Sequence, residues 1–192
     1  MLKKIAILAC ALTVLFIVCG GKPKPEEKPV LPAFVAAVES IDSICVASIT
    51  RTGFYSGAGS VMGELMGWIG KNKIVPAGPP FGIHYDDPTK VKPESTRYEI
   101  CVPVAVGTKG DQAVKVKKLD PILAAVATHV GPYEKVGETY GKLMTWIVDN
   151  KYLPSGPPRE YYLNDPTQVP AESLKTKIFM PVKPAEPPAV TK

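Results

Sequence analysis

The chain has 192 residues, of which 45% are hydrophobic and 21% are charged, with 21 prolines and 16 glycines. This length suits one domain or two small ones. The apolar content excludes a chain that is disordered throughout, and the irregular spacing of glycine excludes a collagen-like chain. Only one apolar run approaches the length of a membrane span, which excludes a polytopic membrane protein. The formal net charge of +5 is spread along the chain, so a nucleic-acid partner is not expected.

The N-terminus has the pattern of an export signal. Two lysines precede an uncharged apolar run, residues 5–18, which is short for a spanning helix but typical of a signal-peptide core. Cys19 and two glycines follow, which resembles a bacterial lipoprotein signal, where the cysteine becomes the lipidated first residue. Val18 departs from that pattern, because the residue before the cysteine is usually small. We expect residues 1–19 to be a signal peptide with lipidation at Cys19; an uncleaved anchor and plain secretion are the alternatives.

All three alternatives place the rest of the chain outside the cytoplasm. Residues 20–33 are rich in proline and charge, which predicts an extended tether between a membrane and a folded domain. Residues 184–192 form a similar tail. The expected location is therefore the cell envelope, with the protein anchored to a membrane on its extracytoplasmic side.

The remaining residues, 34–183, contain an internal sequence repeat of two copies. Residues 34–104 align without gaps to residues 112–182, and about 28 of roughly 71 aligned pairs are identical. The segment KNKIVPAGPP aligns with DNKYLPSGPP, and GELMGWI aligns with GKLMTWI. This repeat predicts a duplicated fold with a pseudo-twofold axis. Residues at equivalent positions of the two copies are called twins below.

Each copy shows the same order of predicted elements. An apolar, β-branched run predicts a first strand, a glycine-rich turn and helical apolar spacing predict a helix, and two further apolar runs predict a second and a third strand. The predicted strands are residues 41–51, 81–85 and 98–104 in the first copy and residues 119–130, 160–163 and 176–182 in the second, with residues 35–38 and 113–116 extending or preceding the first strands. The predicted helices end before Pro76 and Pro154. The fold class is α+β, with duplicated strand-helix-strand-strand units, an antiparallel sheet and two helices.

Four segments of the second copy carry a family resemblance: HVGPY, LMTWI, EYYLNDP and TKIFMPV. They resemble the GyrI-like effector-binding fold, which is also the ligand domain of AraC-type and multidrug-sensing regulators. The resemblance covers nearly all of residues 34–182. It implies a cleft between two halves, lined by aromatic side chains around a buried carboxylate, for small organic and often cationic molecules. Regulators of this family carry a DNA-reading part before this domain. Here an export signal and a tether take that place, so the resemblance implies a ligand-binding domain without the DNA-reading part.

Glu160 is the first candidate for the ligand site. It lies in a second-strand segment where the family often carries an acid, and its twin is Gly82, so one wall of the cleft carries charge and the other leaves room. A carboxylate in an apolar cleft is unfavourable unless a cation pairs with it, which selects a cationic ligand. Of the two tyrosines that follow, Tyr162 should share its side of the strand, with His84 as twin. The alternative is a solvated glutamate at a strand edge that pairs with Arg159.

Four aromatic residues complete the candidate set. Tyr55 and Tyr133 are identical twins at the helix starts. Their rings either stack on a flat ligand, with the hydroxyl as a hydrogen-bonding group, or pack into the hydrophobic core. Trp68 and Trp146 are further candidates for ligand contact, although packing into the core is the favoured interpretation.

Glycines recur every four residues in the first predicted helix, at Gly59, Gly63 and Gly67. Each destabilises a helix by about 0.5–1 kcal/mol relative to alanine, so the pattern predicts close approach of another helix or a ligand.

Two further pairs of residues carry open alternatives. Glu99 and Lys177 are twins on the third strands; they form an ion pair across the axis if the halves pair through those strands, and are surface charges otherwise. Cys45 and Cys101 either form a disulfide in an oxidising compartment or pack as thiols.

The leading functional hypothesis is membrane-tethered binding of small amphipathic or cationic molecules without chemistry. Some relatives of the fold hydrolyse strained rings with a pocket glutamate and tyrosine, so a hydrolase of small electrophilic compounds that uses Glu160 and Tyr133 is the alternative. A haem carrier of the SOUL type is disfavoured by the scarcity of histidine, and a structural envelope protein is the fourth hypothesis. The sequence has no metal-ligand spacing, phosphate loop or nucleophile elbow, so we expect no metal and no cofactor.

Overall fold

The computed structural model of the protein describes residues 33–185. The predicted signal peptide, the lipidation site at Cys19 and nearly all of the predicted tether lie outside the described residues, as does most of the tail. Within residues 33–185, neither helix combines the length and the apolar character needed to cross a bilayer.

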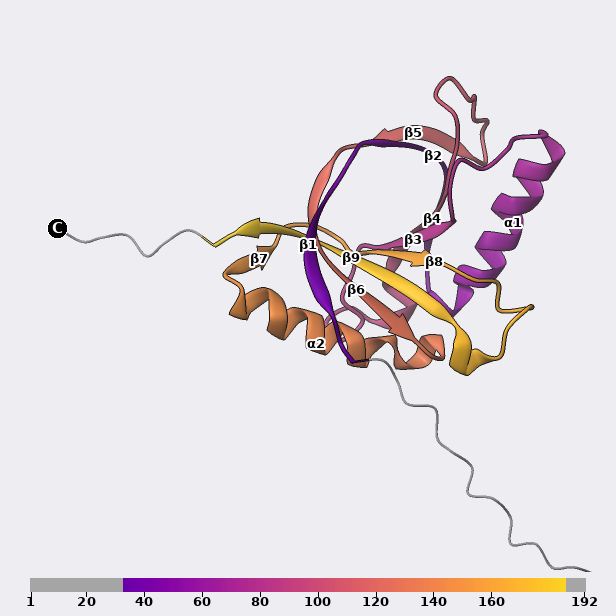
Figure 1. The fold of residues 1–192 in the computed structure, drawn as a ribbon. Coiled ribbons are helices and arrows are strands. Elements are labelled where there is room, and N and C mark those ends of the chain that lie inside the picture. Colours follow the sequence, from indigo (N-terminus) through magenta and orange to yellow (C-terminus); the bar gives the residue numbers. More distant parts are fainter. Residues whose placement is uncertain (1–32, 186–192) are drawn as a thin grey trace, which may run out of the picture. The chain divides into compact units, whose positions relative to one another are not determined.

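The described part of the chain forms two helices and nine strands, shown in Figure 1. The elements are, in chain order, β1 (Ala36–Ile41), β2 (Ile44–Thr52), α1 (Ala58–Lys71), β3 (Phe81–His84), β4 (Arg97–Pro103), β5 (Lys115–Leu119), β6 (Ile122–Val130), α2 (Val136–Asp149), β7 (Tyr152–Pro154), β8 (Arg159–Tyr162) and β9 (Lys175–Pro184). Each helix has 14 residues and follows a short 3-10 turn that begins at Tyr55 or Tyr133. The twin residues Lys73 and Lys151 follow the helices with positive φ angles of 53° and 63°, which ends each helix by turning the chain away.

The strands form one antiparallel sheet in the order β1-β6-β9-β8-β3-β4-β2-β5, and β7 pairs with β9. The two copies meet where β3 pairs with β8. Gly82 lies opposite Glu160 at the centre of this pair, with Phe81 opposite Tyr161 and Ile83 opposite Arg159. The predicted α+β class, with an antiparallel sheet and two helices, is therefore confirmed, and the pseudo-twofold axis passes between the second strands.

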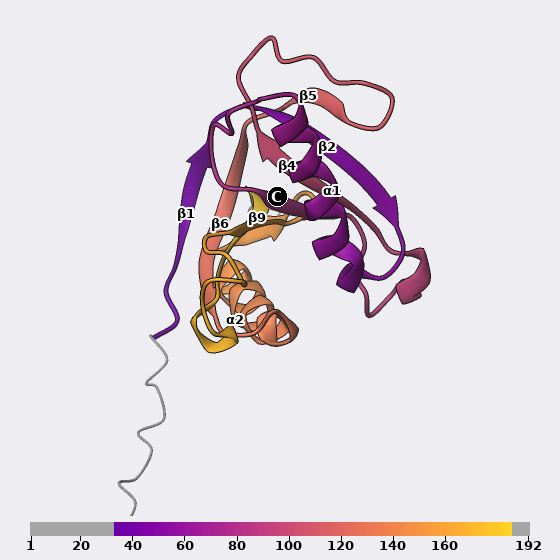
Figure 2. The same ribbon diagram turned by 90° about the vertical axis from the view of Figure 1, so that its right-hand side faces the viewer.

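Each copy begins with a short strand, β1 or β5, that pairs with a strand of the other copy. We call β1 and β5 the exchanged strands. β1 pairs with β6, and its counterpart β5 pairs with β2, as Figure 2 shows. The two ladders share one register, because Ile41 lies opposite Ile122 and Ile44 lies opposite Leu119. The prediction that continuous strands begin at Ile41 and Leu119 is wrong, since these residues end β1 and β5. Two-residue breaks, at 42–43 and 120–121, separate them from β2 and β6.

Both helices pack on one face of the sheet, which we call the helix face. α1 covers a cluster that includes Ile100, and α2 covers an equivalent cluster that includes the twin Ile178. The exchanged strands complete these clusters, because residues at β5 such as Val116 join the first and Ala36 of β1 joins the second. Each copy thus contributes one strand to the edge of the other copy's apolar cluster.

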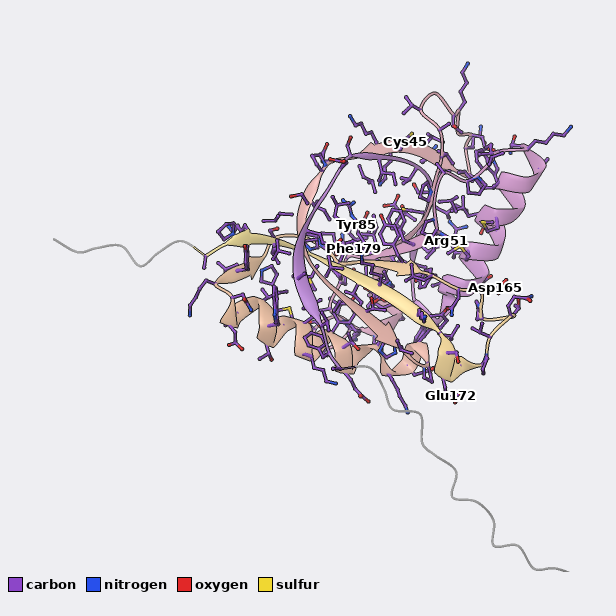
Figure 3. The ribbon with its side chains drawn as sticks, viewed as in Figure 1. Cys45, Arg51, Tyr85, Asp165, Glu172 and Phe179 are labelled. Carbon is purple, nitrogen blue, oxygen red and sulfur yellow. The ribbon has the colours of Figure 1, made fainter. Side chains whose placement is uncertain are left out.

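The opposite face of the sheet, which we call the inner face, carries a second set of apolar side chains. Phe81 stacks on Tyr161 with ring centroids 4.3 Å apart, and Tyr161 meets Phe179 edge-on at 4.8 Å. These rings join the two copies directly beneath the β3–β8 pair. Figure 3 shows Phe179, with Tyr85, inside the curve of the sheet, while both helices lie outside it.

The expectations for Glu99 and Lys177 are wrong, because the copies meet through their second strands and not their third. Glu99 is buried on the inner face, where it pairs with Lys117 of β5 at 2.8 Å and accepts a hydrogen bond from Tyr85. Lys177 pairs with Glu39 of β1 at 3.3 Å. Glu39 and Lys117 are themselves twins, so the two ion pairs are equivalent in position and opposite in charge order.

Cys45 and Cys101 are both free thiols. Cys45 packs against the α1 cluster, whereas Cys101 belongs to the inner face. Because a strand points successive side chains to opposite faces, the two sulfur atoms lie on different sides of the sheet and do not form a disulfide. Burial raises the pKa of the Cys101 thiol, so this side chain remains protonated and acts as a packing group.

Candidate ligand-binding site

The candidate site lies on the helix face, where the two copies meet. Gly82 and Glu160 are opposite one another in the β3–β8 ladder, and their outer neighbours are Ile100 and Ile178 of the two helix-covered clusters. The pseudo-twofold axis therefore passes between a glycine and a glutamate. The twins face each other in this register, but the prediction that the Gly82 side leaves room for a ligand is wrong, because the side chains of Tyr162 and His84 occupy that space.

Glu160 is mostly buried, with only 12% of its side chain exposed. The Tyr140 hydroxyl of α2 donates a hydrogen bond of 2.8 Å to one carboxylate oxygen, and the Nε2 atom of His84 lies 3.4 Å from the other. Burial raises the pKa of Glu160, but the neighbouring His84 imidazole, the Tyr140 hydroxyl and His129 outweigh it, so the pKa is lowered overall. The site therefore holds an ionised carboxylate near neutral pH. The alternative of a solvated strand-edge glutamate is wrong.

Tyr162 and its twin His84 flank Glu160 on the same face, as the sequence indicated. A methyl group placed on Gly82 would lie 2.8 Å from the Tyr162 hydroxyl and 3.0 Å from His84 Nε2. The space that the missing side chain leaves is thus filled by these two polar tips. Burial, followed by the charge of Glu160, raises the pKa of Tyr162, so its hydroxyl stays protonated beside the carboxylate. Arg159 precedes Glu160 but points to the inner face, so the two do not pair.

Tyr55 and Tyr133 lie at the outer ends of this cluster. The Tyr55 ring meets His84 edge-on at 4.7 Å, and its hydroxyl donates a 2.6 Å hydrogen bond to the Asp86 carbonyl. Tyr133 meets Tyr162 edge-on at 5.8 Å and is 36% exposed. Five of the predicted site residues thus form one continuous cluster, in which the Tyr133 ring is exposed at the edge and the Tyr55 ring packs against the α1 cluster. Their role in binding remains a prediction.

Trp68 and Trp146 lie outside this cluster, near the C-terminal ends of α1 and α2. Both pack against the helix-covered apolar clusters, and the Trp68 indole donates a hydrogen bond of 2.7 Å to Asp111. A helix of this length separates its ends by about 20 Å, which places them far from the tyrosines at the helix starts. The structure therefore fits the packing interpretation of both tryptophans.

The glycine pattern of α1 has no steric explanation within the described residues. A side chain added at Gly59, Gly63 or Gly67 would meet no heavy atom within 4 Å. Close approach of another helix to these glycines is therefore not found among residues 33–185, and close approach of a ligand stays a prediction.

Sequence reasoning did not identify Tyr140 as a site residue. Its twin is Met62, which packs against the first core. A tyrosine that replaces an apolar twin on a buried helix face needs a partner for its hydroxyl, and this contrast is the signal that could have identified it. Near the start of α2, His129 and Thr139 form a second buried polar contact of 2.8 Å between Nδ1 and Oγ1. In the described part of the chain, no cluster of histidine, cysteine and carboxylate side chains is arranged to hold a metal ion.

Comparisons with known proteins give relatives of the same fold. The C-terminal domain of EcmrR superposes with a TM-score of 0.67 at 24% identity, and covers 80% of this chain and 100% of that one. SAV2435, in a structure bound to tetraphenylphosphonium, superposes with a TM-score of 0.51 at 14% identity, and covers 78% and 94%. At these identities the likeness concerns the fold. The probable transcriptional regulator YgiV of Escherichia coli O157:H7 is 28% identical over 105 residues, which span 53% of this chain and 66% of YgiV, just under two thirds.

The model of the GyrI-like small molecule binding domain matches residues 37–183, which include both copies of the repeat and the whole Glu160 cluster. This match spans most of the chain. The protein therefore belongs to the GyrI-like family of small-molecule-binding domains.

Proposed function

We propose that the protein binds small cationic, amphipathic organic molecules at the Glu160 cluster. The observation that carries this proposal is a mostly buried, ionised carboxylate enclosed by aromatic rings. In a low-dielectric site, a carboxylate attracts a cation more strongly than in water, and the faces of tyrosine rings add cation–π attraction. A neutral ligand gains neither contribution. The bound tetraphenylphosphonium in the SAV2435 structure, a lipophilic cation, supports this ligand class for the shared fold.

Binding at this site requires side chains to move, because the cluster is closed. Tyr162 and His84 fill the space next to Gly82, and Tyr140 holds the carboxylate from the opposite side. The rings at the edge, Tyr55 and Tyr133, are joined to this inner group by edge-on contacts. A ligand that enters between these rings replaces the contacts that Tyr140 and His84 make with Glu160. Its affinity depends on the difference in free energy between its own interaction with Glu160 and the contacts that it replaces.

The closed arrangement also favours binding over hydrolysis. A general base must reach a water molecule within hydrogen-bond distance. Both oxygens of Glu160 are instead contacted by Tyr140 and His84. In the closed arrangement both oxygens are therefore engaged in holding the site together, and ligand binding is the function that this geometry supports best.

The experiment compares two ions of the same shape and opposite charge, tetraphenylphosphonium and tetraphenylborate, by calorimetric titration of the full chain. The wild type should bind the cation at least about tenfold more tightly than the anion, and Glu160→Gln should remove that preference. Glu138→Gln, a substitution at an exposed position of α2, is the matched control and should leave it unchanged. Equal affinity of the wild type for both ions, or an unchanged preference in Glu160→Gln, would contradict the proposal.

We further propose that this receptor is tethered to a membrane on the extracytoplasmic side. The support is the sequence pattern of residues 1–33, a charged start, an apolar core, Cys19 and a proline-rich spacer. Cells fed with radioactive palmitate should yield labelled protein, and Cys19→Ala should abolish the label while Cys45→Ala retains it. Label that persists in Cys19→Ala would contradict lipidation at this residue.

A further inference from the structure

A second candidate site lies on the inner face, behind Glu160. Arg159 immediately precedes Glu160 on β8, so its side chain points to the other side of the sheet, opposite Ile83 and Phe179. Only 7% of Arg159 is exposed. Its twin is Phe81, a fully buried apolar residue. Because the fold accepts phenylalanine at the equivalent position of the other copy, a charge here is not a requirement of the fold.

The guanidinium of Arg159 is not matched by a negative charge. Within residues 33–185, no carboxylate oxygen lies within ion-pairing distance of it, and its buried Nη1 atom has no hydrogen-bond partner. Nη2 makes a long contact of 3.4 Å to the backbone carbonyl of Asp120. The buried carboxylate of the inner face, Glu99, is already bonded to Lys117 and Tyr85. A buried charge without a partner is unfavourable, so an anion that reached this guanidinium would supply the missing partner.

Arg159 lines a groove of about 340 Å³ that opens to solvent. This volume lies in the lower range of small-molecule sites. The walls are mainly apolar and come from both copies, with Ile83 on one side and Leu119, Ile122 and Pro181 around it. Asp120 also lines the groove and is exposed, so its carboxylate is solvated and its repulsion of an anion is screened.

We propose that this groove binds a small organic carboxylate with an apolar body, the carboxylate on Arg159 and the body against the aliphatic walls. The ligand is opposite in charge to the one proposed for the helix face. The two sites lie back to back on β8, through the neighbouring residues Arg159 and Glu160. The inner-face site therefore goes beyond the proposed function and does not depend on it.

The test titrates the full chain with 2-naphthoate and with its uncharged analogue 2-naphthylmethanol. The wild type should bind the carboxylate at least about tenfold more tightly than the alcohol, because the carboxylate forms a charge-assisted, bidentate contact with the guanidinium. Arg159→Met should remove this preference, and Arg159→Lys should keep part of it. Glu138→Gln, at an exposed position of α2, is the matched control and should leave the binding of 2-naphthoate unchanged.

A second variant keeps the proposal testable if Arg159→Met does not fold. Ser155 lies exposed at the rim of the groove, so Ser155→Trp should fill the entrance and abolish binding of both compounds, while Ser155→Ala retains it. The proposal is overturned if the wild type binds the two compounds equally, if folded Arg159→Met or Ser155→Trp binds 2-naphthoate as the wild type does, or if Glu138→Gln loses that binding.

Discussion

Reversing the charge of Lys117, by Lys117→Glu, should lower the free energy of unfolding by about 2–3 kcal/mol at neutral pH. The equivalent change in the other copy, Glu39→Lys, should lower it by less than about 1 kcal/mol. The difference follows from burial. The Glu99 side chain beside Lys117 is 2% exposed, so it cannot be solvated when its partner is lost. Lys117 itself is 42% exposed, which keeps the effect below that of a fully buried pair. Glu39 and Lys177 are 41% and 32% exposed, and water replaces their contact.

The effect of Lys117→Glu should depend on pH in a defined direction. Burial raises the pKa of Glu99, but hydrogen bonds from Lys117, Ser48 and Tyr85 outweigh burial and lower it overall. A carboxyl with a lowered pKa in the folded state stabilises the protein above its unfolded pKa, and this stabilisation is lost as pH falls through the folded value. A second carboxylate beside Glu99 raises that pKa instead. The difference between variant and wild type should therefore be largest near pH 7, shrink as pH falls through the raised pKa of the variant, and shrink further below about pH 4.5, where the wild type loses its own stabilisation.

Urea unfolding of the full chain at several pH values measures both effects. A matched test of the cause is the double variant Glu99→Lys with Lys117→Glu, which restores an ion pair with the charges exchanged. It should recover part of the lost stability, giving a coupling energy of about 1 kcal/mol or more between the two sites. Additive effects of the two single changes, or an equal loss in Glu39→Lys, would show that the buried pair does not account for the result.

These two ion pairs also give a physical reason for the exchange of β1 and β5. Without exchange, β1 would fold back on β2 as a hairpin with a two-residue turn at 42–43, in the register that β5 now occupies. Glu39 would then lie where Lys117 lies, beside Glu99, and Lys117 would lie beside Lys177. Both contacts would join like charges, whereas the exchanged arrangement makes both attractive. Pro121 acts in the same direction, because the favoured type I′ turn of a two-residue hairpin needs a positive φ at this position and proline fixes φ near −65°.

The exchange explains which parts of the fold were predictable. Helix positions and the second and third strands follow from local spacing of apolar residues, and the repeat doubles that signal at each position. The partner of β1 does not follow from it, because a closed hairpin and an exchanged strand use the same residues in the same register. The charge order of Glu39, Lys117, Glu99 and Lys177 contains the information. It can be interpreted only when the neighbouring strands are known, so the sequence led to the wrong pairing for two of these residues.

The candidate site was predictable to a similar extent, for the positions along its strands but not for its contacts with other elements. Alternation along β8 places Tyr162, and not Tyr161, beside Glu160, and the repeat then brings in His84 as its twin. Contacts between elements were not predictable in this way. Tyr140 reaches Glu160 from a helix whose rotation depends on packing, and the free charge of Arg159 becomes evident only when every neighbouring carboxylate has been assigned a partner.

Removing the Tyr140 hydroxyl should change stability and cation affinity in opposite directions. In Tyr140→Phe the buried Glu160 carboxylate loses a donor 2.8 Å away, which should lower the free energy of unfolding by about 1–3 kcal/mol. The phenol is a donor throughout the ordinary pH range, because burial and the charge of Glu160 raise its pKa well above the usual value. A cation that binds Glu160 competes with this hydrogen bond. In the variant, Glu160 lacks this hydrogen bond before the ligand arrives, while the aromatic ring is kept. Because the cation has one contact fewer to replace, tetraphenylphosphonium should bind several-fold, up to about tenfold, more tightly than in the wild type.

Tyr133→Phe is the matched control for this change. Tyr133 lies at the accessible edge of the same cluster, and within residues 33–185 no group hydrogen-bonds its hydroxyl, so both stability and affinity should stay close to those of the wild type. Urea unfolding and calorimetric titration of the same preparations measure the two quantities. A loss of both in Tyr140→Phe would mean that the hydroxyl contacts the ligand directly, and unchanged affinity would mean that Glu160 does not exchange partners on binding. Only opposite signs agree with a closed cluster in which Tyr140 holds the carboxylate until a cation replaces it.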